Sequence, residues 1–517
     1  MHNLLTEPLI RARRAKDGAT EAAPLPAVLA ALMRDEITAF PVLRPHQRHA
    51  WHAFLAQLGA IALHSASLTE PPEDEARWRD LLRALTPEFA DDAPWRLVVA
   101  DPTKPAFLQP PAPEGELSAY RNRITAADQL DVLVTAKNFD IKQATATDAE
   151  PDDWLFALID LQTMEGYLGA GNYGIVRMNG GFSARSFLGL APVDDGPGVH
   201  LRRDILAMLA ARDETAQGSH GYPAEGGAAL LWLLPWDGTD SLSLDQLDPY
   251  FIEICRRVRL AQEGGRLYAV AAGSKAARIA GKEAKGNLGD PWAPVHLSEA
   301  KSLTLSDQDW THELLFRLLF KSPPEWAVPP LAERQARDAS GPMLLVAEAF
   351  ARGNSKTDGF KSRVVPVPVA MVRELFGERP KAIAPGLLAD IASVDLALRN
   401  GLVIVAAGGV REKVKSEHYS RSLHARKALK RQADMMFFPE LWTRMAATSD
   451  AGLTPIRRTF LERLARIARE EFARALPAIP CASLMRPRAE ARGRQALEYG
   501  LARAMPEKAA EETHVEA

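Results

Sequence analysis

The sequence predicts an α+β protein, in which a large mixed α/β domain at residues 1–366 is followed by a C-terminal four-helix bundle at residues 367–505 and a polar tail at 506–517. Up to residue 366, apolar residues recur at helical spacing in some segments and alternate with polar residues in others. After it, the apolar spacing is helical almost throughout. A length of 517 residues is enough for several domains, each with its own core.

Several segments of the first domain have apolar residues at helical spacing, which predicts helices. These segments are Leu25–Arg34, Pro45–Ala62, Trp78–Leu85, Asp153–Met164 and Asp309–Phe320. Between residues 201 and 260, short apolar runs alternate with turn formers, so we expect strands and turns there. Within that region, Phe251–Leu260 alternates apolar and charged residues, as a half-buried strand does.

Long helices are predicted in the second domain at Leu387–Arg399, Glu412–Met436, Thr454–Ala475 and Ala489–Ala504. In the third of these, Phe460, Leu464 and Phe472 share one stripe of the helix. The arginines of the same segment fall outside that stripe, at positions Arg463, Arg466 and Arg469. An apolar stripe with charges on the opposite side is what a bundle helix requires.

The composition excludes several classes of protein. A formal net charge of −3 argues against a histone-like protein, whose whole surface would be basic. No apolar run approaches the roughly 18 residues of a membrane span, and the basic residues near the N-terminus follow a short apolar segment, the reverse of a secretory signal. We therefore expect a cytoplasmic protein without a membrane segment. Cys255 and Cys481 form no CxxC pattern, and we expect both to be buried.

Basic residues are concentrated in one stretch of the second domain. This basic stretch comprises Lys413, Lys415, Arg421, Arg426, Lys427, Lys430 and Arg431. Such a run is either a solvated helix face or a surface for an anionic partner.

A glycine loop follows the apolar, strand-like run Gly174–Val176. Asn179, Gly180 and Gly181 stand next to each other there, with Arg185 shortly after them. The glycines could form a tight turn that needs positive φ. Alternatively, they could let another backbone or a polyanion approach closely, because they carry no Cβ.

Two further segments offer polar and basic side chains. Residues 353–359 lie between strand-like runs and are rich in turn formers, which predicts a hairpin whose tip carries Asn354, Ser355, Lys356 and Thr357. Residues 131–143 interleave cations with an aromatic ring and an amide, at Lys137, Asn138, Phe139 and Lys142. That combination suits the end of a nucleic acid, because the ring can stack on a base while the lysines meet phosphates. The alternatives are an ordinary surface hairpin and a strand leaving the core.

Enzyme and metal motifs are incomplete. Residues 169–176 fit the GxGxxGxV loop of protein kinases, but no VAIK, HRD or DFG string follows. A nucleotide-binding enzyme using this loop is therefore only an alternative, and no catalytic residue or cofactor is expected. His46, His49 and His52 lie three residues apart, but no HExxH pattern or neighbouring carboxylate accompanies them, so we expect structural histidines and no metal site.

Taken together and in order, several segments resemble the CasA family, the large subunit of the type I-E CRISPR complex called Cascade. They are NLLTEPLI, PAFLQPP, the lysine and aromatic segment, MNGGF, GDPWAPV, the hairpin and the terminal helices. The resemblance implies a subunit without a catalytic centre that assembles with crRNA and with backbone, small and crRNA-capping subunits. It also implies recognition of the protospacer-adjacent motif (PAM) in double-stranded target DNA through the minor groove, opening of the first base pairs, and recruitment of a helicase-nuclease.

By position, the resemblance assigns roles to individual residues. Asn179, Gly180 and Gly181 would lie against the PAM minor groove, and Lys301 would reach the PAM from a neighbouring strand. The hairpin residues Asn354, Ser355, Lys356 and Thr357 would touch the PAM and wedge beneath it, with Lys356 standing where relatives carry glutamine. Lys137, Asn138, Phe139 and Lys142 would dock on the crRNA 5′ end, and the basic stretch could hold DNA. A structural subunit of another nucleoprotein assembly remains an alternative.

Overall fold

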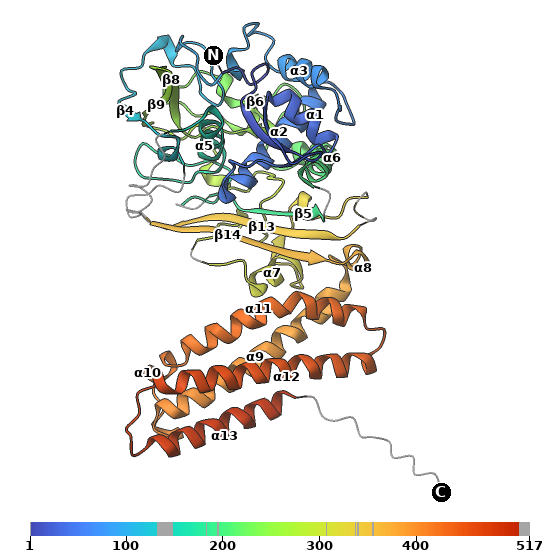
Figure 1. The fold of residues 1–517 in the computed structure, drawn as a ribbon, viewed down its shortest axis with the longest axis vertical. Coiled ribbons are helices and arrows are strands. Elements are labelled where there is room, and N and C mark those ends of the chain that lie inside the picture. Colours follow the sequence, from blue (N-terminus) through green and yellow to red (C-terminus); the bar gives the residue numbers. More distant parts are fainter. Residues whose placement is uncertain are drawn as a thin grey trace. The chain divides into compact units, whose positions relative to one another are not determined.

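The computed structural model describes residues 2–131, 148–181, 184–193, 196–306, 308–336, 338, 341–353 and 356–505. The chain divides into two compact units, Met1–Trp310 with Pro324–Val372, and Thr311–Pro323 with Arg373–Ala517. The first unit combines helices with several small sheets, and the second is helical (Figure 1). The predicted α+β class is therefore confirmed. The second unit is discontinuous in sequence, because the short helix α7 (His312–Leu319) belongs to it.

Helices form the core of the first unit. They are α1 (Leu25–Met33), α2 (Arg48–Ser65), α3 (Glu75–Ala84), α5 (Pro151–Met164) and α6 (Gly196–Gln217). Helix α2 packs against α3, α5 and α6 and is buried over most of its surface. Its aromatic residues Trp51 and Phe54 are 3% and 1% exposed. A helix that is apolar on nearly all sides is stable only when it is surrounded in this way.

The described residues form five small sheets around these helices. The first contains β1 (Ile10–Arg14), β2 (Thr20–Ala23) and β3 (Ile37–Ala39) in the order β2-β1-β3, and the second contains β4 (Asn122–Ile124), β8 (Arg257–Glu263) and β9 (Arg266–Ala272) in the order β4-β9-β8. The third is the parallel pair β6 (Ala228–Leu230) and β7 (Leu247–Ile252). The fourth contains β10 (Val295–His296), β11 (Lys301–Ser302) and β12 (Trp326–Ala327) in the order β11-β10-β12.

The fifth sheet contains the predicted hairpin. Strands β13 (Met343–Gly353) and β14 (Lys356–Val367) pair antiparallel, and β5 (Phe187–Pro192) pairs with the other edge of β13 (Figure 1). The register shifts between Ala351 and Arg352, close to the tip. Such a bulge increases the local twist of a hairpin and redirects its end. The predicted hairpin is confirmed for the backbone on both sides of the tip.

Up to residue 505, the second unit contains four long helices, α9 (Glu378–Ala406), α11 (Leu423–Ala446), α12 (Asp450–Ala475) and α13 (Arg486–Ala504), besides α7 and the short α10 (Ser416–Ser420) before α11. Helix α9 contacts the other three long helices. Helices α9 and α13 approach each other at Gly401 and Gly493, where a Cβ on either residue would lie within 3 Å of the other's carbonyl oxygen. The predicted stripe of α12 is buried at Phe460, Leu464 and Phe472.

Two predictions between residues 201 and 260 are wrong. Residues 196–217 form one helix, α6, where we expected strands and turns. Charged residues on its buried side obscured the pattern, because Arg203, Asp204 and Arg212 are buried in ion pairs. Residues 251–260 belong to two strands, β7 and β8, and not to one half-buried strand. The buried arginine Arg259 of β8 donates to the carbonyl oxygen of Lys104 at 3.0 Å.

Three smaller expectations also differ from the structure. Residues 412–436 are not one helix, since α10 ends at Ser420 and α11 begins at Leu423. Residues 174–176 form no strand. Cys255 is buried, but Cys481 is partly exposed. Within the described part of the chain, no helix is both long enough and apolar enough to cross a bilayer.

Candidate nucleic-acid interface

The glycine loop rises from a buried segment of the first unit. Residues 175–178 are buried, Asn179 is half-buried, and Gly180 and Gly181 are exposed. Both glycines have positive φ, 56° and 81°. A Cβ built on either glycine would meet no atom within 4 Å. The backbone conformation therefore favours glycine, while the space beside the loop is open to another molecule.

Buried polar groups hold the segment that precedes the loop. The Val176 amide donates to Glu253 Oε1 at 2.6 Å. The Arg177 guanidinium lies 4.0 Å from the centre of the Phe251 ring and donates to the carbonyl oxygen of Pro249 at 3.0 Å. Burial raises the pKa of Glu253 to about 7, against the lowering effects of the Val176 amide and Arg177. The position of the exposed loop thus depends on charged groups beneath it.

The segment after α5 closes the loop from its other side. The Tyr167 amide donates to the Gly181 carbonyl at 2.8 Å, and the Ile175 amide donates to the Glu165 carbonyl at 2.9 Å. A Cβ on Gly174 would lie 2.6 Å from the carbonyl carbon of Gly166. Close packing of two backbone segments therefore accounts for the last glycine of the kinase-like pattern.

Lys301 lies next to the glycine loop. It is in β11, and its ammonium group pairs with the Glu299 carboxylate. Its neighbour Ser302 donates its amide to the Lys285 carbonyl at 3.0 Å. A Cβ on Gly286 would lie 2.1 Å from Ser302 Oγ and 2.5 Å from the carbonyl carbon of Met178. Gly286 therefore fits between β11 and the start of the glycine loop, where no larger residue would fit.

The hairpin reaches the same region through a buried ion pair. Arg352, near the end of β13, places a guanidinium nitrogen 2.6 Å from Glu165 Oε1, and the two side chains are 2% and 3% exposed. Burial raises the pKa of Glu165, and Arg352 opposes that effect. The Glu165 carbonyl also accepts the Ile175 amide, and the Phe350 carbonyl accepts the Ala184 amide at 3.0 Å. The end of the hairpin is thus linked to both sides of the glycine loop.

The structure therefore brings together some of the predicted site residues, while others lie outside the part of the chain that it describes. Asn179, Gly180, Gly181 and Lys301 lie in one region with the strand ends that flank the hairpin tip. Lys356 and Thr357 begin β14. The remaining predicted residues lie outside the described part of the chain: Asn354, Ser355, Lys137, Asn138, Phe139 and Lys142.

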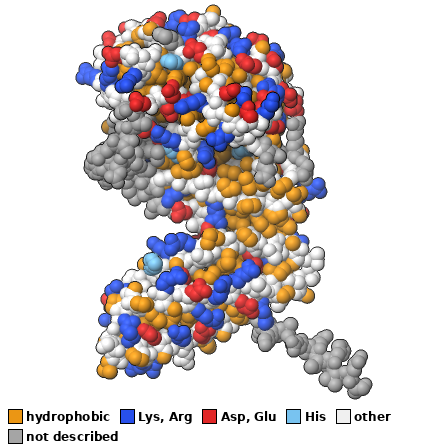
Figure 2. Space-filling view, in the orientation of Figure 1, with side chains coloured by type: hydrophobic (Ala, Val, Ile, Leu, Met, Phe, Trp, Pro, Cys, Tyr) orange, Lys and Arg blue, Asp and Glu red, His pale blue; other side chains and the backbone are white. Residues whose placement is uncertain are grey.

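The basic stretch lies in the second unit, on α10, α11 and the turn before them. Arg426 makes two hydrogen bonds to Asp395, at 2.8 and 2.6 Å, and Lys430 pairs with Glu313 at 2.8 Å. Within the described residues, the other five form no ion pair and are exposed: Lys413, Lys415, Arg421, Lys427 and Arg431. Figure 2 shows lysine and arginine side chains over this part of the unit. Two of the predicted cations are therefore already neutralised by the protein itself.

Sequence reasoning missed the groups beneath the site, namely Glu165, Glu253, Gly286 and Arg352. A charged residue in a sequence suggests exposure, and only long-range contacts reveal that these three charges are buried. Nothing near Gly286 in the sequence indicates what approaches it.

Two clusters could hold a metal ion among the residues that the structure describes. They are His46 with Asp131 and Asp160, and His52 with His200 and Asp204, and within each cluster the ligand atoms lie within 4.8 Å of one another. The expectation that no carboxylate accompanies these histidines is wrong. The carboxylates come from distant parts of the chain, so spacing around the histidines could not reveal them.

Comparison with known proteins supports a single family. The family described as CRISPR-associated protein Cse1 matches residues 3–470. The fold is similar to Thermus thermophilus CasA (Cse1), with 16% identity, 97% of this chain and 99% of that chain covered, and a TM-score of 0.62. It is also similar to Thermobifida fusca Cse1, with 15% identity, 97% and 98% covered, and a TM-score of 0.60.

A third similar structure is a chain from a CRISPR RNA-guided surveillance complex, with 14% identity, 98% and 99% covered, and a TM-score of 0.50. No curated protein matches the sequence. At these identities the solved structures establish a shared fold, while the match over residues 3–470 establishes the family. The resemblance to CasA is confirmed, and this chain belongs to the CRISPR-associated protein Cse1 family.

Proposed function

We propose that this chain is the large, non-enzymatic subunit of a crRNA-guided surveillance complex and recognises the PAM of double-stranded target DNA through the minor groove. One observation carries the proposal: the glycine loop, Lys301 and the ends of the hairpin lie together in the first unit, joined through Gly286 and the Arg352–Glu165 pair. Their sequence positions are far apart, so their proximity is a property of the fold.

The chemistry of these segments suits a minor groove. The groove is about 6 Å wide and presents few distinguishing groups, so that a protein there senses mainly A·T against G·C and groove width. Gly180 and Gly181 present backbone without side chains, which allows close approach. Lys301 would add one cation at the same place once its pair with Glu299 opens. We therefore expect recognition of several related PAM sequences, not of a single one.

The proposal extends to the steps after PAM recognition. The hairpin residues Asn354, Ser355, Lys356 and Thr357 would enter the duplex beneath the PAM and help to open the first pairs for crRNA pairing. Each opened step costs about 1.4 kcal/mol, which the growing RNA–DNA heteroduplex offsets. Lys137, Asn138, Phe139 and Lys142 would contact the crRNA 5′ end. The basic stretch would hold DNA, and a helicase-nuclease would be recruited afterwards.

Gly181→Asp in the assembled complex tests the proposal. The aspartate would add a side chain and a negative charge where the minor groove is to approach. We expect at least about tenfold weaker binding of a PAM-containing duplex, a loss of about 1.4 kcal/mol. Binding of a duplex without a PAM should change little, so the preference for the PAM should fall. Equilibrium binding of the two labelled duplexes measures both effects.

Gly18→Asp is the matched control. Gly18 has a φ of 69° and, like Gly181, no atom within 4 Å of a built Cβ, but it lies in the turn between β1 and β2. The two substitutions therefore carry a similar conformational cost and the same change of charge. Equal PAM preference in the two variants would contradict the proposal.

A further inference from the structure

A second group of residues, unrelated to the glycine loop, lies between two helices of the first unit. His200 and Asp204 are four residues apart on α6 and share one face of that helix. His52 comes from α2 and faces the same carboxylate. His52 Nε2 lies 2.8 Å from Asp204 Oδ2, and His200 Nε2 lies 3.2 Å from the same oxygen. The two imidazole rings are stacked, with centroids 4.0 Å apart.

We propose that His52, His200 and Asp204 form a binding site for a divalent transition-metal ion of the zinc class. Imidazole nitrogens and a carboxylate oxygen are the ligands that such ions prefer. In a tetrahedral site with bonds of about 2.0 Å, ligand atoms lie about 3.3 Å from one another. The observed separations of 2.8 and 3.2 Å need only small movements to reach that value.

Hydrogen bonding favours a metal over a purely structural role for the histidines. His200 Nε2 is buried and forms no hydrogen bond, although it lies 3.2 Å from the carboxylate. Asp204 Oδ2 thus faces two imidazole nitrogens but forms a hydrogen bond of good geometry only with His52 Nε2, at 2.8 Å. A bound ion would engage both nitrogens and the carboxylate at once.

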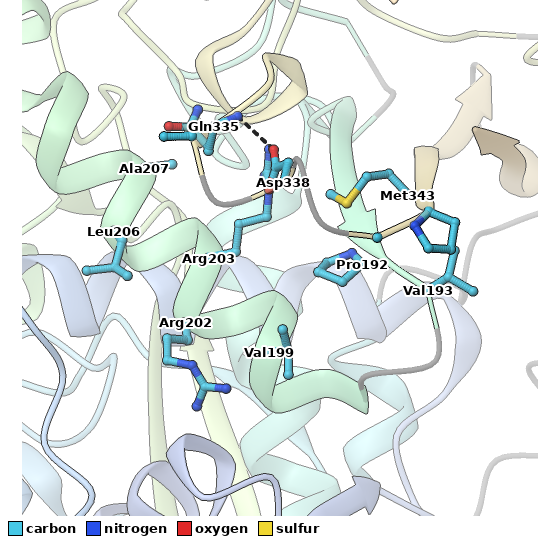
Figure 3. Close-up of a pocket in the computed structure, with 13 residues that line it drawn as sticks. Pro192, Val193, Val199, Arg202, Arg203, Leu206, Ala207, Gln335, Asp338 and Met343 are labelled. Atoms are coloured by element: carbon cyan, nitrogen blue, oxygen red, sulfur yellow. Dashed lines mark hydrogen bonds and ion pairs between the residues drawn. The ribbon is translucent and has the colours of Figure 1, made fainter. Parts of the chain in front are cut away.

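The carboxylate is fixed by groups outside the cluster. Arg203 donates to Asp204 Oδ1 at 2.9 Å, which leaves Oδ2 facing the two histidines. Arg203 itself donates two hydrogen bonds of 2.9 Å to Asp338. Both residues line a second pocket, and Figure 3 shows the Arg203 side chain pointing toward Asp338 there. Metal sites commonly have such supporting hydrogen bonds, which orient the ligands.

An ion could also reach the cluster. His52 and His200 line a cavity of about 460 Å³, and their side chains are 16% and 19% exposed. Glu348 of β13 and His49 of α2 line the same cavity. Both ring nitrogens of His49 are buried without a hydrogen-bond partner. The three proposed ligands leave a fourth position on the cavity side, as in open sites with three protein ligands.

Metal binding by the full chain, without partners or nucleic acid, tests this inference separately from the proposed function. After removal of metals with EDTA, we expect one Zn²⁺ per chain by isothermal titration calorimetry and a rise in the midpoint of thermal unfolding. Mg²⁺ should give neither effect, because it prefers oxygen ligands. Co²⁺ should bind the same site and give visible absorption bands that report the ligands.

Three histidine variants identify the ligands. His52→Gln and His200→Gln should each weaken Zn²⁺ binding at least tenfold, remove the rise in the unfolding midpoint and change the Co²⁺ bands. His46→Gln, in the other candidate cluster, should change none of these. Absence of Zn²⁺ binding to the wild-type chain, or loss of binding in His46→Gln but not in His200→Gln, would overturn the proposal. Asp204→Asn gives a second test if either glutamine variant is poorly folded, and it should also abolish binding.

Discussion

Two regions of this chain are suited to meet a polyanion, and they are built in opposite ways. The glycine loop presents backbone, and its position is set by buried groups below it, among them Glu253 and the Arg352–Glu165 pair. Five of the seven side chains of the basic stretch are exposed, and no ion pair among the described residues holds them; only Arg426 and Lys430 are held, by Asp395 and Glu313.

The difference lies in how each region depends on the rest of the fold. A backbone loop can be displaced by a change in a residue that never touches the ligand, because the loop has no other means of keeping its position. Exposed charges act nearly independently of one another, and salt screens each of them. We therefore expect large effects from single changes beneath the loop and small, salt-sensitive effects from single changes in the basic stretch.

The largest effect should follow from Arg352→Met. The Glu165 carboxylate would remain buried without its ion-pair partner, which costs about 3–5 kcal/mol of the free energy of unfolding. Urea unfolding followed by tryptophan fluorescence measures this loss in the first unit, because every tryptophan except Trp442 lies there. We also expect DNA binding by the assembled complex to fall, since the Glu165 carbonyl accepts the Ile175 amide of the segment that precedes the loop.

Two further variants sharpen this prediction. Arg352→Met combined with Glu165→Gln removes both charges and should recover most of the lost stability. Arg14→Met breaks the exposed ion pairs of Arg14 with Asp17 and Glu21 and should cost much less stability, because water already solvates these charges. A single Arg352 variant as stable as the Arg14 variant would show that burial does not set the difference between the two pairs.

A smaller effect, dependent on pH, is expected from Glu253→Gln. Burial raises the pKa of Glu253 from 4.5 to about 7, so folding favours the protonated carboxyl. Its stabilising contribution is fully present below pH 4.5 and is lost as the pH rises through about 7. Glutamine keeps the acceptor for the Val176 amide but does not ionise, so it should be the more stable protein above pH 7, by at most about 3 kcal/mol.

Thermal midpoints of both proteins between pH 5 and pH 9 check this. We expect the curves to lie close together at pH 5 and to separate as the pH rises, with the wild-type chain lower at pH 9. Parallel curves would mean that ionisation of Glu253 places no strain on the segment beneath the loop.

How far the sequence predicts this molecule depends on the range of the interactions concerned. The hairpin of β13 and β14 and the stripe of α12 follow from local pattern, because turn formers and apolar spacing act over a few residues. Helix α6 could not be predicted in the same way, since Arg203, Asp204 and Arg212 are buried by partners elsewhere in the chain.

The candidate site follows the same rule. The glycine pair and the basic stretch can be recognised in the sequence because the residues of each are close together in the chain. The grouping of the loop with Lys301 and the hairpin depends on two contacts. Gly286 packs between Ser302 and Met178, and Glu165 pairs with Arg352, which is 187 residues away in sequence. No local pattern indicates either contact.

The smallest effect should distinguish two lysines on one helix. Lys427 and Lys430 are both on α11, but only Lys430 is paired with an acid, Glu313, among the residues that the structure describes. If the basic stretch holds DNA, Lys427→Gln should weaken binding about two- to threefold at low salt and reduce the slope of log Kd against log salt by about 0.9. Lys430→Gln should change the slope less, because Glu313 already neutralises that charge. Equal slopes in the two variants would mean that the exposed charge of Lys427 meets no phosphate. Of the two regions compared, only the glycine loop would then be expected to contact nucleic acid.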